Sequence, residues 1–194
     1  MDVSTPAYIA MIIAMTGLLS IAINVATYRE RGILRRYRVT PLHSTAILAA
    51  QVVVNFVMTL LGALLLVIAA RLVYGLRFEG NALSILGAFT LSALSFFTVG
   101  FLLAGLVPTA RVANIVGMVI FYPNLFLSGA TLPKEMFPDG VLLVSRILPL
   151  TYVVDLLQGL WFGEAWGVHL TEVAVLVGML AVGVVVSART FRWE

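Results

Sequence analysis

A serine and a histidine are the residues of this chain whose types could perform covalent chemistry. Ser128 precedes Gly129, and His169 lies at the start of the last apolar segment. A serine activated by a histidine is the nucleophilic pair of an intramembrane serine protease, provided that the two side chains meet within hydrogen-bond reach. Ser128, however, lies in a loop flanked by prolines, and Glu172 is one helical turn from His169 as an ordinary partner. The protease is therefore a weak alternative.

Most other catalytic chemistry is excluded by residue type. The chain has no cysteine and two histidines, so thiolate chemistry and a Cys-based metal site are excluded. The histidines, His43 and His169, are expected on opposite sides of a membrane and cannot share a metal. The sequence also lacks the GxxxxGK[ST] pattern that cradles the phosphates of a nucleotide. We therefore predict that the chain itself has no catalytic residue, no metal and no cofactor.

The elements that carry these residues are expected to be apolar helices. Of the 194 residues, 61% are hydrophobic and 11% are charged, with a mean hydropathy of +1.07, whereas a soluble domain is about 25% charged. A helix crosses a bilayer with roughly 20 apolar residues, and stretches such as LLGALLLVIAA lack the alternation of a barrel strand. We predict an all-α membrane protein with one transmembrane domain over residues 1–194. The five expected spans cover residues 7–27, 46–70, 82–107, 112–127 and 168–188.

The distribution of charge predicts the orientation. Residues 29–38 contain five arginines and one glutamate, and short cytoplasmic loops carry the excess of Lys and Arg. This segment is therefore expected in the cytoplasm, which places the C-terminus inside and the N-terminus outside. The net charge of +3 reflects this topology rather than nucleic-acid binding. An odd number of spans that starts outside also fits a chain without an initial helix.

The polar side chains in the interiors of the predicted spans are uncharged. Their central parts lack Asp, Glu, Lys and Arg, which ion-coupled carriers usually place at mid-depth, so the energy for any uphill transport must come from another subunit. Gly100 with Ala104, and Ala113 with Gly117, permit close helix approach within the chain or in a dimer. Hydrogen bonds between helices are the default role of the polar residues Asn24, Gln51, Asn55, Ser92, Ser95, Thr98 and Asn114.

Residues 132–163 contain prolines and two apolar pieces that are too short to cross a membrane. Because proline ends helices, we expect a broken helical hairpin that re-enters the outer leaflet as a gate, or as a purely structural lid. Tryptophan favours the headgroup level, where Trp161 is expected. The candidate gate residues are Pro123, Ser128, Gly129, Pro133, Pro149, Tyr152, Asp155 and Trp161.

The segment ERGILRRYRVTP, residues 30–41, separates apolar from basic residues when it is placed on a helix. This pattern predicts an amphipathic helix on the cytoplasmic surface over residues 29–41. A docking surface for a cytoplasmic partner is one reading. A solvated charge cluster or a contact with anionic lipid is the other.

The same segment resembles the E-R-x-G…T-P signature of the cytoplasmic coupling helix in type-2 ABC transporter permeases. FYPNLFLSGATLPKEMFP, residues 121–138, and LPLTYVVDLLQGLWFG, residues 148–163, resemble that family's later spanning helix, outer hairpin and x-P-x-T-Y-x-V-D segment. The three motifs occur in the family's order and cover nearly the whole chain. The resemblance is greatest to drug-efflux permeases of the daunorubicin type, with polysaccharide exporters as cousins.

The resemblance implies a permease subunit of an ATP-driven exporter in the plasma membrane of a prokaryote, moving a hydrophobic drug, a lipid or a lipid-linked glycan. Two permeases, as a homodimer or a heterodimer, would pair with two cytoplasmic ATPase subunits that bind ATP and Mg²⁺. Glu30, Arg31 and Gly32 would begin the coupling helix. The implied coupling residues are Glu30, Arg31, Gly32, Ile33, Arg35, Arg36, Tyr37 and Pro41.

Two departures from the family pattern qualify this expectation. The family normally has six spans, and its first span has no counterpart among these residues, which fits an N-terminally shortened member. Gln158 stands where relatives often have an arginine. A scaffold subunit that keeps the fold without transporting is therefore the main alternative.

Overall fold

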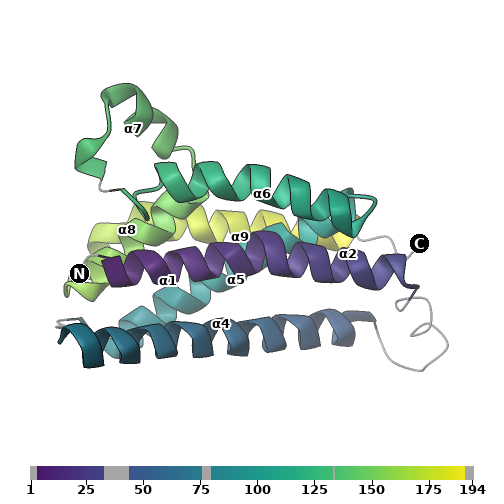
Figure 1. Ribbon diagram of the computed structural model, residues 1–194, viewed down its shortest axis with the longest axis horizontal. Helices are drawn as coiled ribbons and strands as arrows, with labels where there is room; N and C mark the ends of the chain where they lie inside the picture. The colour runs from purple at the N-terminus through teal and green to yellow at the C-terminus, as the bar shows by residue number, and fades with distance from the viewer. Residues whose placement is uncertain (1–3, 33–43, 76–79, 133, 191–194) are drawn as a thin grey trace.

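In the computed structural model the described residues are 4–32, 44–75, 80–132 and 134–190, and their regular elements are all helical. Five helices in these ranges are long and apolar enough to cross a membrane, which confirms the predicted number of spans for the described part of a multi-pass membrane protein. They lie side by side along the long axis of the molecule (Figure 1). The candidate spans are Ser4–Glu30, Ala49–Tyr74, Ala82–Leu106, Ala110–Leu127 and Trp166–Ser187.

The first span forms the centre of the bundle. It consists of α1 (Ser4–Met15), a π-helical segment η1 (Thr16–Ile21) and α2 (Ala22–Glu30). It contacts α4 (Ser44–Tyr74), α5 (Ala82–Leu106), α6 (Ala110–Leu127) and α8 (Pro149–Trp161). We call the end of the bundle at Glu30 the elbow end, and the end at α7 and α8 the hairpin end (Figure 1).

Small residues allow these helices to approach closely. A Cβ atom on Gly100 would lie 2.1 Å from the carbonyl oxygen of Gly17, and one on Gly117 would lie 2.8 Å from that of Leu18. Glycine at such crossings lets two backbones touch. The predicted close approach at Gly100 and Gly117 is therefore confirmed, as packing within one chain.

Helix α9 (Leu170–Thr190) packs along α5. The Ser95 hydroxyl donates to the Leu176 carbonyl at 2.8 Å, and Gly183 lies against Thr98. For Ser95 the expected hydrogen bond between helices is confirmed.

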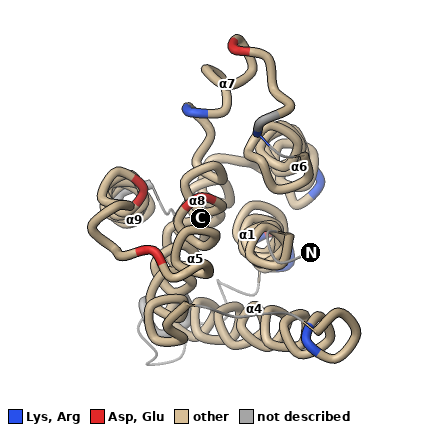
Figure 2. The backbone as a smooth tube through the Cα atoms, turned by 90° about the vertical axis from the view of Figure 1, so that its left-hand side faces the viewer, with Lys and Arg blue, Asp and Glu red and all other residues tan. Residues whose placement is uncertain are grey.

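Helix α4 lies at the edge of the bundle (Figure 2). Within the described ranges its substantial contacts are with α1, η1 and α5, and it runs along the lower side of the bundle when this is viewed from the hairpin end (Figure 2). Only 17% of its most apolar window is buried, against 56% for the first span. Most of its surface therefore faces away from the protein.

The hairpin consists of the 3-10 turn η2 (Lys134–Met136), α7 (Asp139–Ser145) and α8, followed by the 3-10 turn η3 (Trp166–His169). Helices α7 and α8 meet at 92°, and α7 projects away from the bundle (Figure 1). Pro149 occupies the first turn of α8, where its missing N–H costs nothing. A broken helical pair is present, but the expectation of Trp161 among lipid headgroups is wrong. Because α8 packs inside the bundle, that side chain is only 2% exposed.

Candidate functional site

At the elbow end, two neighbouring charged residues of α2 bind the turn between α5 and α6. The Arg29 guanidinium donates to the carbonyl of Ala104 at 2.9 Å and to that of Val107. The Glu30 carboxylate accepts from the backbone N–H of Ala110 at 2.9 Å. We call this arrangement the elbow junction. It joins the end of the first span to the end of α5 and the start of α6.

The charges of the elbow junction match the helix ends that they contact. The C-terminal end of a helix carries partial negative charge and the N-terminal end partial positive charge. Arg29 therefore lies at the favourable end of α5, and Glu30 at the favourable end of α6. Charge-assisted hydrogen bonds are also stronger than neutral ones. The two residues stabilise the turn from both sides.

At the elbow junction the structure differs from the expected start of the coupling helix. Glu30 is the last residue of α2, and the backbone N–H of Arg31 still donates to the carbonyl of Thr27. Gly32 has a φ of 63°, a left-handed conformation that commonly ends helices. Glu30, Arg31 and Gly32 thus end the first span instead of beginning the next helix. The remaining expected coupling residues lie outside the described ranges, namely Ile33, Arg35, Arg36, Tyr37 and Pro41.

A polar cavity of about 500 Å³ lies between the first span and α4, in the half nearer the elbow end. It brings together three of the seven predicted intramembrane polar residues, Asn24, Gln51 and Asn55. The side-chain amide of Asn24 donates to Ser20 of its own helix, and that of Asn55 to the Gln51 carbonyl. For these amides the structure differs from the expected bonds between helices, because an amide can reach a partner one turn back on its own helix.

Two further predicted polar residues lie elsewhere. Asn114 is half-buried on α6 and does not line this cavity. Ser92 is fully buried on α5, and within the described ranges its hydroxyl has no hydrogen-bond partner. The polar wall of the cavity is completed by residues that sequence reasoning missed. These residues are Thr16, Ser20 and Tyr28 of the first span and Thr59 of α4. Together with Asn24, the three residues of the first span repeat every four positions, and this spacing was the available signal in the sequence.

At the hairpin end, the bend between α7 and α8 is closed by side chains of the x-P-x-T-Y-x-V-D segment. The Thr151 hydroxyl donates to the Ser145 carbonyl and the Tyr152 hydroxyl to the Arg146 carbonyl, each at 2.6 Å. Asn124 of α6 accepts from the backbone N–H of Leu150 at 3.3 Å. We call this bend the hairpin corner. Sequence reasoning missed Asn124, because its partner lies on another element.

The other predicted gate residues have separate surroundings. Pro123 is part of α6, and its side chain is exposed. Pro133 lies outside the described ranges. Asp155 of α8 forms an ion pair with Lys134, so this carboxylate anchors the loop after α6. Gly129 has a φ of 88°, and a Cβ atom there would lie 2.9 Å from the Lys134 side chain. The pair and the glycine together shape the loop.

The structure gives Ser128 and His169 separate partners. The Ser128 hydroxyl accepts from the backbone N–H of Ala130 at 3.3 Å. His169 Nε2 lies 2.8 Å from Glu164, and Nδ1 lies 3.8 Å from Glu172. A Ser–His protease requires the two side chains to bond to each other, which is not the arrangement here.

The hairpin corner yields a first prediction. Thr151→Val removes the buried donor to Ser145, which should cost about 1–3 kcal/mol of unfolding free energy and lower the Tm of the purified chain. Thr90→Val is the matched control, since the Thr90 hydroxyl bonds only one turn back on its own exposed helix face. Equal Tm values for the two variants would contradict the assigned role of Thr151.

The known proteins that are similar to this chain include two ABC transporter permeases and a nodulation protein. The chain is 27% identical over 169 residues to the daunorubicin resistance ABC transporter permease protein DrrB1 of Streptomyces coeruleorubidus, covering 84% of this chain and 59% of the relative. It is 25% identical over 160 residues to the probable multidrug ABC transporter permease YbhR of Escherichia coli K12, covering 82% and 44%. Nodulation protein J of Rhizobium meliloti is 29% identical over 90 residues, which is 46% of this chain and 33% of that protein.

The chain thus spans about half the length of the curated permeases that it matches. No solved structure shows significant similarity to it. Residues 2–162 match the ABC-2 type transporter family, a range that includes the elbow junction and the hairpin corner. The chain belongs to the ABC-2 type transporter family.

Proposed function

We propose that this chain is the membrane-spanning part of an exporter's permease subunit, in the plasma membrane of a prokaryote. It moves a hydrophobic drug, a lipid or a lipid-linked glycan, and a separate cytoplasmic ATPase subunit drives it. The match of residues 2–162 to the ABC-2 type transporter family carries this proposal. ATP and Mg²⁺ bind to the ATPase, so this chain contributes helices that move rather than residues that react.

The proposed assembly contains two permease copies and two ATPase subunits, with the elbow in the cytoplasm. The excess of arginine in residues 29–38 supports that orientation. The elbow junction supports a mechanical role. A force applied to the residues after Gly32 reaches α2 directly, and α5 and α6 through Arg29 and Glu30. Three spans would then move together when the ATPase subunits close.

The name of one relative suggests the transport probe. DrrB1 is a daunorubicin resistance permease, so daunorubicin is a suitable hydrophobic test compound. The chain is reconstituted in vesicles with a candidate cytoplasmic ABC ATPase subunit. We expect ATP hydrolysis to change when the chain is present, and daunorubicin to move only with ATP. Nucleotide hydrolysis by the chain alone would contradict the proposal. If the chain changes the rate of ATP hydrolysis but neither lipid nor drug moves with ATP, the chain is a scaffold subunit instead.

A glycine pair tests whether the elbow transmits force. Gly32 and Gly75 have φ values of 63° and 62°, and a Cβ atom placed on either would have no neighbouring atom within 4 Å. Alanine at either position meets the same left-handed backbone strain of roughly 1–2 kcal/mol. We expect Gly32→Ala to lower ATP-dependent transport several-fold and Gly75→Ala, just after the C-terminal end of α4, to leave it nearly unchanged. An equal loss of transport in the two variants would show that backbone strain alone lowers transport and that the elbow has no role in it.

A further inference from the structure

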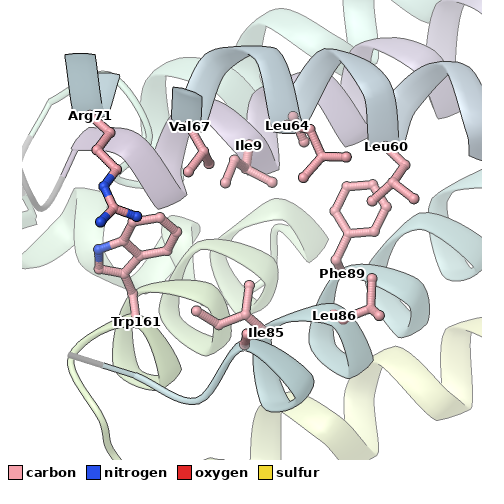
Figure 3. A pocket seen from close by; sticks show the side chains of 11 residues that line it. Ile9, Leu60, Leu64, Val67, Arg71, Ile85, Leu86, Phe89 and Trp161 are labelled. Carbon is pink, nitrogen blue, oxygen red and sulfur yellow. The ribbon is translucent and has the colours of Figure 1, made fainter. Parts of the chain in front are cut away.

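A second cavity, of about 440 Å³, lies toward the hairpin end between α1, α4, α5 and the end of α8. Its volume is within the range of small-molecule sites. Aliphatic and aromatic side chains form its walls, among them Leu60, Val67, Ile85 and Phe89 (Figure 3). At one end, the Arg71 side chain points toward the indole of Trp161 (Figure 3).

The chemistry of the walls defines the ligand. Arg71 is the one charged residue among the eleven described residues that line the cavity. An apolar cavity accepts a hydrocarbon chain, while a guanidinium binds phosphate through two parallel hydrogen bonds. Arg71 also lies in the last turn of α4, near the level where a span ends. A ligand that fits both ends carries an acyl chain and an anionic phosphate.

The exposure of the walls indicates where the ligand comes from. Leu64 of α4 and Leu86 of α5 line the cavity and are 48% and 44% exposed. Both helices are candidate membrane spans, so the cavity opens sideways toward surrounding hydrocarbon. Helix α4 is also little buried against the rest of the protein. An acyl chain in this space would fill the gap between α4 and α5.

We propose that the cavity binds one anionic phospholipid of the surrounding bilayer, with an acyl chain between α4 and α5 and its phosphate on Arg71. The bound lipid completes the packing of α4. This site is independent of the exporter function, because it depends only on the protein lying in a membrane.

Native mass spectrometry of the full chain in detergent tests the site, with dioleoyl phosphatidylglycerol as the anionic probe and dioleoyl phosphatidylcholine as the zwitterionic one. We expect one phosphatidylglycerol retained per chain, and a preference over phosphatidylcholine that Arg71→Gln reduces about tenfold, as expected for a lost charged hydrogen bond. Arg146→Gln is the control, because it removes the same charge from an exposed position at the hairpin corner. Equal retention of both lipids, or equal effects of both variants, would overturn the proposal.

A second pair of variants tests the acyl-chain position. Ala63 is 5% exposed and lines the cavity, whereas Ala69 lies exposed on the same helix. Ala63→Phe should abolish retention of phosphatidylglycerol and Ala69→Phe should preserve it. If inorganic phosphate alone displaced the lipid, the acyl chain would have no role in binding. A shift from dimer to monomer in Ala63→Phe, seen in the same spectra, would show that a second copy occupies the space and that the proposal is wrong.

Discussion

Glu30→Lys is expected to lower ATP-dependent transport at least about tenfold in the proposed exporter assembly. The substitution removes the acceptor for the backbone N–H of Ala110 and places a cation at the N-terminal end of α6, where positive charge is unfavourable. A hydrogen bond to a charged group contributes about 1.5–3 kcal/mol, which corresponds to a tenfold change in rate or more if the bond is needed at the transition between states. The measurement is ATP-driven daunorubicin movement beside ATP hydrolysis in the same vesicles.

The pattern of effects separates lost coupling from lost structure. Glu30→Gln keeps an oxygen that can accept from Ala110 and should reduce transport only a few-fold. Arg111→Gln is the control, since Arg111 is exposed at the same end of α6 and its replacement also changes the charge there. In Glu30→Lys we expect ATP hydrolysis to continue while transport falls. Transport at the unmodified rate in Glu30→Lys would contradict a role for the elbow junction.

Gly100→Ala is expected to destabilise the helix bundle strongly for a substitution that adds a single methyl group. The new Cβ atom would lie 2.1 Å from the backbone oxygen of Gly17 and 3.1 Å from Ile21. A backbone oxygen in a packed helix cannot move aside as a flexible side chain does, so α5 must shift away from the first span. Overpacking of this kind costs about 1–3 kcal/mol, and occasionally more. The Tm of the detergent-purified chain should fall by several degrees.

Gly178→Ala is the matched control for this effect. Gly178 lies in α9, and no atom outside its own helical turn lies within 4 Å of a Cβ atom placed there. The same substitution should therefore leave the unfolding free energy unchanged or raise it by up to about 1 kcal/mol, because alanine favours a helix interior over glycine. If Gly100→Ala melts at the same temperature as Gly178→Ala, the close crossing of α5 and the first span is not present in solution.

The main elements of the fold follow from local features of the sequence. The length of an apolar segment determines whether a helix can cross a bilayer, and five long apolar segments predicted the five candidate spans found in the described residues. Proline likewise acts on its own neighbours. The prolines of residues 132–163 predicted a broken helical pair, in which Pro149 begins α8, and small residues such as Gly100 predicted close packing without naming the partner helix.

The partners of the site residues were decided only by the tertiary structure. Glu30 bonds to Ala110, 80 residues away, and it is the last residue of α2, where sequence reasoning expected the coupling helix to begin. Asn24 and Asn55 share a cavity, and Trp161 is buried within the bundle and not among headgroups. The physical reason is that helices apolar on nearly every side give little indication of which face turns inward. Rotation and crossing of such helices depend on contacts between segments far apart in the chain, and those contacts position every side chain of the candidate site.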